Sequence, residues 1–488
     1  MKKYLLGLDE GTTSARAVLY DLNSHKIIGS SRHLIKQFYP QNGWVEQDAT
    51  QIYSTVTLCM REVLREFDVG SNELAGVGLT NQRETIVAFD IETGEPVYNA
   101  IVWQCRRTAD YIASLPAKTK TAIREKTGLI PDAYFSASKM KWILENVPKA
   151  KELAKLGKLR IGTIDAYLAY KLTGNFVTDT TNASRTMLFN IHTLDYDDEL
   201  LKFFGVSRVM LPKIAESASV IGKINFLGNV ELCSIIGDQQ SSLFGQGCTK
   251  AGMAKNTYGT GGFILMNTGT SPVSECKNLL STVALTLDGK TTYALEGSIF
   301  SVSSAINWLG HSLRLFQSVN DTENMSFDLP SNQGVYFVPA FTGLGAPYWQ
   351  PNARAIICGL TFDSDRRHIV RAVLESICYN TKAIIDEMSS AGIKISSLRV
   401  DGGACKNNFL MQFQADMLDL EVKRLATSEA TVLGCIYLAG ICKKVIKVSD
   451  LPKVIQMGDS FKPHMSDETR NKLYSGWQNA VKKSCEDK

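Results

Sequence analysis

The run Tyr-Leu-Leu-Gly-Leu-Asp-Glu-Gly-Thr-Thr-Ser-Ala-Arg-Ala-Val-Leu-Tyr occupies residues 4–20 and predicts a β-hairpin. Its apolar residues at 4–8 and 17–20 favour two strands, and the polar residues at 9–14 favour a turn between them. A weaker copy follows about 250 residues later, where Asn256–Gly262 is expected as a turn before the apolar run Phe263–Met266. Two such hairpins predict duplicated domains that face each other.

The length of the chain agrees with a duplication. A chain of 488 residues exceeds one ordinary core, so two large domains or three small ones are expected. Strand-like and helix-like segments alternate along most of it, which predicts α/β architecture. We place the boundary near residues 245–252, where Gly245, Gly247 and Gly252 are flexible points, and expect domains at 1–248 and 249–488.

Two further elements are predicted in the second half of the chain. Apolar residues from Ile369 to Met388 recur at mostly helical spacing after a possible cap at Asp365. This helix leads to a predicted strand at 398–400, which runs into Asp401-Gly402-Gly403-Ala404. The tail at 470–488 is expected to be helical and basic.

Composition excludes several classes of protein. Lys and Arg total 53 against 49 Asp and Glu, and a formal net charge of +4 predicts no nucleic-acid partner. Hydrophobic residues make up 44% and charged residues 21%, as in ordinary soluble domains. We see neither a membrane span nor a signal peptide. The 11 cysteines form no C-x-x-C pair and the six histidines show no zinc spacing, so we expect reduced thiols in a cytoplasmic protein without a structural metal.

The polar turn Asp9–Ser14, together with Arg16, is a candidate phosphate site. Its glycine lets backbone N–H groups approach a phosphate, three hydroxyls can donate to it, and the Asp9 carboxylate can hold Mg²⁺ through water. Arg16 would add charge-assisted contacts. An ordinary hairpin turn, which favours Asp, Gly and Thr, explains the same residues.

Three competing enzyme signatures fail at single positions. Ala284 stands where a Walker A loop ending in Lys290-Thr291 requires glycine. Ile264 occupies the third glycine position of a dinucleotide fingerprint, and residues 310–314 lack the final glycine of a nucleophile elbow.

Asp238 is a candidate general base. It follows the apolar Ile235-Ile236, and an aspartate at the end of a buried strand could accept a proton from a hydroxyl that attacks phosphorus. It could equally cap a helix that starts near Gln239.

A scattered polar and aromatic set suits a small polyol. Leu74–Leu79 is predicted as a buried strand whose polar continuation includes Arg83 and Glu84, and Trp103 and Tyr134 follow later. Arginine donates, glutamate accepts, and aromatic faces cover the C–H side of a polyol. Surface ion pairs and core aromatics explain each residue singly.

Many long motifs, in order along nearly the whole chain, closely resemble the FGGY family of carbohydrate kinases. They are Gly43–Glu46, Thr80–Thr85, Ile101–Arg107, Thr181–Thr186 and Gly343–Trp349, with the two family signatures over Tyr134–Asn146 and Ala355–Glu375.

This resemblance implies two actin-like (ribonuclease H-like) ATPase domains around a central cleft. It implies transfer of the γ-phosphoryl group of ATP to a terminal hydroxyl of glycerol, giving glycerol 3-phosphate and ADP, with Asp238 as the general base and Asp9 beside Mg²⁺. Glycerol would be held by Arg83, Glu84, Trp103, Tyr134, Asp238, Gln239 and Phe263. The nucleotide would be held by Thr12, Thr13, Ser14, Arg16, Thr260, Ser303, Asn307, Gly403 and Asn407. Relatives often form homodimers or homotetramers, so one of these states is expected.

The chain departs from the family pattern at several positions. Glu10 stands where the family usually has Gln, and its charge is expected to weaken ATP binding or to recruit metal. Ser303 and Asn307 stand where Gly and Gln are usual. The resemblance implies that the loop Phe226–Leu232 corresponds roughly to a glycine-rich, arginine-containing loop through which some bacterial relatives bind fructose 1,6-bisphosphate. Here the loop contains no basic residue, so we predict no inhibition by that sugar bisphosphate through it.

Two alternatives remain open. One is an FGGY kinase for another small polyol or a ketose. The residues Arg83-Glu84, Trp103 and Phe263 argue against it, because they favour a small triol as the substrate. The other is a non-catalytic, actin-like regulator that binds nucleotide, against which the presence of both Asp9 and Asp238 argues.

Overall fold

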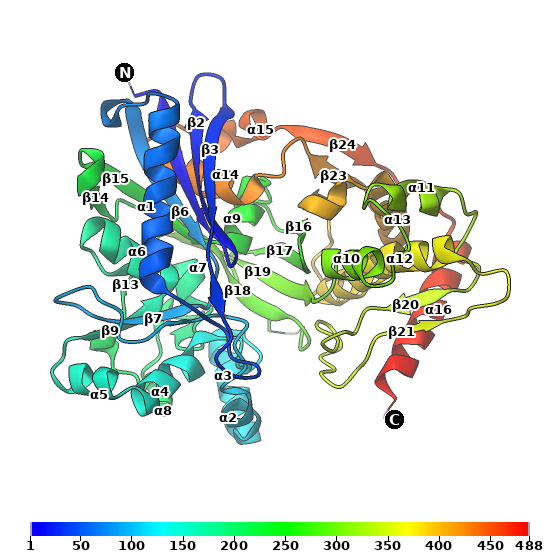
Figure 1. Cartoon of the computed structure of the whole chain (residues 1–488), viewed down its shortest axis with the longest axis horizontal. Coiled ribbons are helices and arrows are strands. Elements are labelled where there is room, and N and C mark those ends of the chain that lie inside the picture. The colour runs from blue at the N-terminus through cyan, green and yellow to red at the C-terminus, as the bar shows by residue number, and fades with distance from the viewer. Residues whose placement is uncertain (1, 275, 487–488) are drawn as a thin grey trace.

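Two large mixed β-sheets form the core of the protein (Figure 1). The structure is a computed structural model and describes residues 2–274 and 276–486. The N-terminal sheet contains, from edge to edge, β14 (Gly222–Ile224), β15 (Val230–Gly237), β6 (Leu74–Asn81), β1 (Tyr4–Glu10), β2 (Ser14–Asp21) and β3 (Lys26–Leu34). The C-terminal sheet contains β18 (Leu280–Leu287), β19 (Lys290–Ile299), β17 (Gly262–Gly269), β16 (Met253–Tyr258), β22 (Ser397–Asp401), β23 (Val422–Leu425) and β24 (Met457–Phe461).

The two sheets repeat one strand plan. In the first, β1, β2 and β3 are successive antiparallel neighbours, and β6 and β15 add parallel to β1 on its other side. In the second, β16, β17 and β19 are antiparallel neighbours, and β22 and β23 add in parallel. This repeated order confirms the α/β class and the two actin-like domains expected from the sequence.

The hairpin at the N-terminus forms as expected and is longer than expected. The strands pair from Tyr4 with Asp21 to Glu10 with Ala15, which leaves a short turn at 11–13. Burial explains the extra length, because Glu10 at the end of β1 and Ser14 at the start of β2 are polar residues with buried side chains.

The turn expected at Asn256–Gly262 is wrong in its first half. Asn256 and Tyr258 belong to β16, and the turn covers only 259–261. Both side chains form hydrogen bonds inside the domain, since Asn256 Nδ2 donates to Thr381 Oγ1 over 3.3 Å and the Tyr258 hydroxyl donates to Gln414 Oε1 over 2.9 Å. Tertiary hydrogen bonds therefore keep these turn-favouring residues extended.

The helices that follow the fifth strand of each sheet cross between the domains. Helix α9 (Asp238–Gly245) continues from β15 and packs against β16, β17 and β18. Helix α14 (Ala430–Cys442) follows β23 and packs against β1, β6 and β15; Figure 1 shows this orange helix among the elements of the N-terminal half. The two helices also pack on each other. Because each helix packs against the sheet of the other domain, the two helices hold the domains together.

The crossing of α9 and α14 depends on two glycines. A Cβ on Gly245 would lie 2.0 Å from the carbonyl oxygen of Ala430, and a Cβ on Gly434 would lie 2.0 Å from that of Ser241. Both distances are far below van der Waals contact, so the backbones approach as closely as they do because neither position carries a side chain.

A third sheet, which the sequence did not predict, extends the N-terminal domain. It contains β4 (Gln37–Phe38), β5 (Glu46–Gln47), β8 (Ala100–Ile101), β7 (Ile86–Asp90) and β9 (Leu159–Thr163). Three of its strands have only two residues, too few to show a hydrophobic alternation.

The remaining elements surround these sheets. The helices are α1 (Ala49–Glu66), α2 (Ala109–Ala113), α3 (Ala117–Thr127), α4 (Ser136–Asn146), α5 (Pro148–Lys155), α6 (Ile164–Thr173), α7 (Thr180–Ala183), α8 (Asp198–Phe204), α10 (Ser303–His311), α11 (Asp321–Phe327), α12 (Arg366–Ser389), α13 (Asn408–Leu418), α15 (Leu451–Val454) and α16 (Asp467–Cys485). The short strand pairs are β10 (Val177–Asp179) with β13 (Lys213–Ala215), β11 (Phe189–Asn190) with β12 (Asp195–Tyr196), and β20 (Tyr336–Val338) with β21 (Ile356–Cys358).

The predicted elements of the second half are present. Asp365 caps α12 by accepting a hydrogen bond from the backbone N–H of Arg367 over 2.8 Å. The strand expected at 398–400 is the centre of β22. The expected tail helix is α16, which begins at Asp467, three residues earlier than predicted, while residues 487–488 lie outside the described part of the chain. Among the described residues, none of the helices is long and apolar enough to cross a membrane.

Candidate active site

Asp238 lies where β15 passes into α9, at the contact between the two domains. The expected capping alternative is wrong in detail, because Asp238 is the first residue of α9 and Gly237 is its N-cap. The Asp238 carboxylate accepts from the backbone N–H of Gln239 over 2.7 Å and from its side-chain amide over 3.1 Å. Its side chain is 28% exposed, which leaves the carboxylate reachable from outside.

A buried network of charged side chains lies next to Asp238. Arg83 Nε lies 3.3 Å from Asp238 Oδ1, and the two Nη atoms of Arg83 donate to Glu296 over 2.7 and 2.8 Å. Arg185 donates from Nε to Glu84 over 2.6 Å and contacts Glu296 at 3.3 Å. The side chains of these four partners are 0–2% exposed. Asp238 is therefore the acid of this cluster that faces solvent.

Burial and charge set the protonation of the two acids that pair with Arg83. Burial raises the pKa of the Asp238 carboxyl, and the Arg83 guanidinium opposes that rise. Burial would also raise the pKa of Glu296, but Arg185 and Arg83 lower it to about 2. Glu296 is thus a fixed anion, whereas Asp238 can take up a proton more readily than an ordinary aspartate.

Lys255, on β16 of the C-terminal sheet, orients Gln239. Its ammonium donates to Gln239 Oε1 over 2.6 Å and to Thr257 Oγ1 over 2.9 Å. Because an ammonium can only donate, this bond directs the amide nitrogen of Gln239 toward Asp238. Burial lowers the pKa of Lys255 to about 8.

The expected aromatic residues lie near this cluster. Trp103 and Tyr134 meet edge to face with ring centres 5.5 Å apart. The indole N–H of Trp103 donates to Thr12 Oγ1 over 2.9 Å, so this ring joins the polyol candidates to the polar hairpin. Phe263, half-buried on β17, stands opposite Thr257 in the strand register.

The backbone of Glu84 lies in the left-handed region, with φ of 60°. This conformation is unfavourable for a residue with a long side chain, and it turns the chain sharply between β6 and β7. The turn directs Glu84 and Arg83 into the same buried network.

The hairpin tip at 9–16 carries partly exposed polar groups. Thr12 is half-buried and Thr13 exposed, while the hydroxyl of Ser14 is buried and accepts from Arg32 Nε over 2.9 Å. Arg16 donates to Asp9 over 2.6 Å and to Glu429, at the start of α14, over 2.7 Å. Arg16 therefore connects the hairpin to the C-terminal half of the chain.

The side chain of Glu10 turns away from the hairpin tip and is fully buried. Its Oε1 accepts from Gln82 over 2.8 Å, and its buried Oε2 has no partner among the described residues. Burial raises the pKa of Glu10 well above its ordinary value. This shift favours the neutral carboxylic acid, which resembles in shape the amide of the Gln that the family resemblance leads us to expect here.

The expected nucleotide residues of the C-terminal domain fall in two groups. Thr260 is exposed at the β16–β17 turn, and the N–H of Ser303 bonds to Gly259 beside it, with Asn307 exposed one turn further along α10. Gly403 is exposed after β22. Asn407 caps α13, since its Oδ1 accepts from Leu410 N over 2.9 Å.

Several residues of the site went unnoticed in the sequence. Arg185 lies in a motif that carries the resemblance but received no role, and Glu296 interrupts the apolar run Ala294-Leu295 on β19. A charge inside an otherwise buried strand was the available signal. Lys255 carries the same signal on β16, whereas Glu429, which precedes α14, has none.

Comparison with known proteins agrees with this architecture. Residues 4–245 match the N-terminal domain and residues 254–442 the C-terminal domain of the FGGY family of carbohydrate kinases. A glycerol kinase from Staphylococcus epidermidis is 48% identical, and one from Thermococcus gammatolerans is 49% identical, each over 99% of this chain and 98% of the relative.

Solved structures give the same result. The crystal structure of Plasmodium falciparum glycerol kinase with ADP shares 35% identity and a TM-score of 0.93 over 99% of both chains. A xylulose kinase from Lactobacillus acidophilus, 24% identical, shares the fold with a TM-score of 0.87. With both domains matched in order and relatives close to half identical over nearly the full length, the chain belongs to the FGGY family of carbohydrate kinases.

Proposed function

We propose that this chain transfers the γ-phosphoryl group of ATP to a terminal hydroxyl of glycerol, releasing glycerol 3-phosphate and ADP. The observation that carries the proposal is Asp238, a partly exposed carboxylate held by Arg83 and Gln239 at the contact between the domains. The names of relatives nearly half identical over the whole chain support glycerol as the acceptor.

Asp238 acts as the general base. A glycerol hydroxyl does not ionise near neutral pH, so its proton passes to Asp238 as the oxygen–phosphorus bond forms and the bond to ADP breaks. Arg83 stabilises the carboxylate before transfer, and Gln239 fixes its orientation. Glu84 and Arg83 hold the hydroxyls, while Trp103 and Tyr134 cover the carbon chain.

The hairpin tip and Arg16 bind the nucleotide phosphates. Arg16 leaves Asp9 and Glu429 to meet phosphate oxygens, and the exposed Thr13 and Thr260 add hydroxyl donors from the two domains. Asp9 keeps 15% of its side chain exposed at the end of β1, and its carboxylate oxygen fits Mg²⁺, which would neutralise phosphate charge when bound.

The Asp238→Asn variant tests the assignment. It keeps the shape and a hydrogen bond to Gln239 but cannot accept the proton, so kcat should fall by about 10²-fold or more while ATP still binds. The measurements are ADP release and nucleotide binding by calorimetry. Asp363→Asn, a change at an exposed position, is the control and should leave kcat unchanged. Turnover of Asp238→Asn close to that of the unaltered protein would refute the role.

The alternative substrate within the family is another small polyol or a ketose. ADP release with glycerol, dihydroxyacetone, erythritol and xylulose separates the two. Glycerol should give the highest kcat/KM, and a strong preference for the five-carbon sugar would overturn the assignment of glycerol.

A further inference from the structure

Glu296 is a fully buried acid on β19 of the C-terminal sheet. In the strand register it stands opposite Leu265 of β17 and Leu280 of β18, so its neighbours across the sheet are apolar. Moving a carboxylate out of water costs free energy, and a buried ion pair often returns no more than that cost. Stability alone therefore does not explain an acid at this position.

Glu296 fixes the orientation of Arg83, which belongs to the other domain. The two Nη atoms of Arg83 donate to the two oxygens of Glu296 over 2.7 and 2.8 Å, and this bidentate contact sets the plane of the guanidinium. Arg83 Nη1 also donates to Gln240 Oε1 over 3.2 Å, and Nε lies 3.3 Å from Asp238 Oδ1. Among the N–H groups of Arg83, one on Nη2 is left without an acceptor within residues 2–274 and 276–486.

Arg185 holds Glu84 in a similar way. Arg185 Nε donates to Glu84 Oε1 over 2.6 Å, and its Nη2 donates to Glu296 Oε1 over 3.3 Å. Glu84 Oε2 accepts no hydrogen bond from the part of the chain that the structure describes. Because Glu84 Oε1 lies 4.0 Å from Arg83 Nε, the two side chains are neighbours. Together they offer a ligand one free donor and one free acceptor.

We infer that Glu296 is a positioning residue of the polyol site, which holds Arg83 so that its free N–H meets a substrate hydroxyl beside the free oxygen of Glu84. A hydroxyl can donate and accept, so one donor next to one acceptor suits two hydroxyls of a polyol. Since Glu296 belongs to the C-terminal sheet, the polyol site is built from both domains. This inference rests on the proposed function, because it takes Arg83 and Glu84 as residues that bind the polyol.

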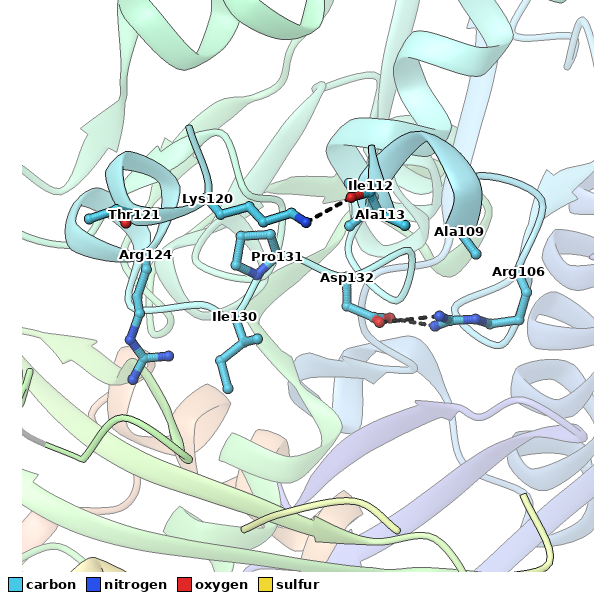
Figure 2. A pocket seen from close by; sticks show the side chains of 10 residues that line it. All are labelled: Arg106, Ala109, Ile112, Ala113, Lys120, Thr121, Arg124, Ile130, Pro131 and Asp132. Carbon is cyan, nitrogen blue, oxygen red and sulfur yellow. Dashed lines mark hydrogen bonds and ion pairs between the residues drawn. The ribbon is translucent and has the colours of Figure 1, made fainter. Parts of the chain in front are cut away.

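An exposed ion pair near the site shows the contrast. Figure 2 shows Arg106 paired with Asp132 at the edge of an open depression beside α2, and Arg106 Nη2 lies 3.2 Å from Asp132 Oδ2. Their side chains are 51% and 31% exposed, so water can replace either partner. Glu296 is buried, and its loss leaves Arg83 without a comparable substitute. Loss of Glu296 should therefore displace Arg83.

Glu296→Gln tests the positioning role. The amide keeps the size of the side chain but offers Arg83 one acceptor in place of two. KM for glycerol should rise roughly tenfold, the effect of losing one charge-assisted hydrogen bond, while KM for ATP changes by less than about twofold. The change leaves two arginines against two acids in the buried cluster, so we expect the variant to fold; the cluster consists of Arg83, Arg185, Glu84, Asp238 and Glu296.

Glu375→Gln is the matched control. Glu375 is also fully buried, on α12, and accepts from Arg371 Nε over 2.6 Å. None of its hydrogen-bond partners among the described residues belongs to the proposed site. Thermal unfolding measures what the loss of a buried carboxylate costs each variant, and only Glu296→Gln should raise KM for glycerol. An equal rise in both variants, or no rise in Glu296→Gln, would overturn the inference.

Two diols that each lack one hydroxyl of glycerol distinguish positioning from a general structural effect. Asp238 takes the reacting hydroxyl in the proposed function, so Arg83 meets another one. With 1,2-propanediol and 1,3-propanediol as competitive inhibitors, the effect of Glu296→Gln on the inhibition constant should disappear for the diol that lacks this hydroxyl. A tenfold weakening with both diols would overturn the inference.

The unaltered protein separates this inference from the proposed function. Absence of ADP release with glycerol would overturn the proposed function, and the inference with it. Full activity of the unaltered protein, together with an unchanged KM for glycerol in Glu296→Gln, would overturn the positioning role alone.

Discussion

At the scale of single residues, the site depends on partners that lie far apart in the sequence. The family resemblance identified Arg83, Glu84 and Asp238, which lie together as expected of a common site. The resemblance gave no role to Glu296, which lies 213 positions from Arg83 in the sequence. Glu296 accepts hydrogen bonds from both Nη atoms of Arg83. Spacing along the chain cannot reveal such a pair, because folding alone brings the two strands together.

Lys255→Met tests whether Lys255 positions the base. The variant keeps the length of the side chain but loses the bond that orients Gln239, so kcat should fall roughly 10-fold or more with little change in KM for ATP. Lys255→Arg should restore part of kcat, since it retains a cationic donor. Steady-state kinetics for ATP and glycerol measure both values. Equal loss in the two variants, or a rise in KM alone, would contradict a positioning role.

Asp165 should make stability depend on pH. It is fully buried on α6, and burial raises its pKa from 3.8 to about 7. The folded pKa lies above the unfolded one, so the native state binds more protons, and the free energy of unfolding falls as pH rises from about 4 to about 7. The full effect is at most about 4 kcal/mol.

Asp165→Asn should remove this pH dependence. The amide cannot ionise and keeps an oxygen that accepts from the Thr178 hydroxyl, as Asp165 does over 2.6 Å. Urea unfolding at pH 5 and pH 8 should show a smaller loss of stability for Asp165→Asn than for the exposed control Asp363→Asn. Identical losses in both variants would mean that Asp165 is already charged at pH 5.

At the scale of elements, the hydrophobic pattern along the chain predicted the regular strands. It failed on the strands that are defined by contacts with residues far away in the sequence. The hairpin of β1 and β2 was foreseen because its apolar runs flank a polar turn. The first half of the Asn256–Gly262 turn is strand, since buried acceptors hold Asn256 and Tyr258 extended. The five-stranded sheet escaped prediction because its two-residue strands are defined by their neighbours and not by their own residues.

Gly434→Ala should separate α9 from α14. The new Cβ would lie 2.0 Å from the backbone carbonyl of Ser241, which cannot move without its helix, so we expect a loss of about 1–3 kcal/mol in the free energy of unfolding. Gly440→Ala is the control on the same helix, because the three atoms nearest to its new Cβ belong to the side chain of Ile446 and not to the backbone of another helix. Chemical denaturation measures both. A loss no larger in Gly434→Ala than in Gly440→Ala would show that the crossing tolerates a methyl group.

At the scale of the whole molecule, the Arg16–Glu429 pair joins the hairpin of β1 and β2 to the C-terminal half. Both side chains are about a quarter exposed, at 24% and 28%, so solvent weakens the attraction without removing it. The same guanidinium is proposed to meet the nucleotide phosphates. Under that proposal, Glu429 and the phosphates of ATP compete for Arg16.

Glu429→Gln should lower KM for ATP by roughly 2- to 10-fold, because it removes a carboxylate near the phosphates and frees a donor of Arg16. The gain should shrink as salt concentration rises. Glu421→Gln, which loses only the surface pair with Lys423, should leave KM unchanged. A higher KM for ATP in Glu429→Gln would show instead that Glu429 organises the binding site.

The exchange of helices between the domains also governs the order in which a newly made chain can fold. The strands β1, β6 and β15 are complete once residue 237 has been synthesised, yet α14, which packs against all three, ends only at Cys442. During the synthesis of about 200 residues, the first sheet has an apolar face without its native cover. The ribosome must therefore release most of the second domain before the first can be completed, and until then that face is open to chaperones and to aggregation.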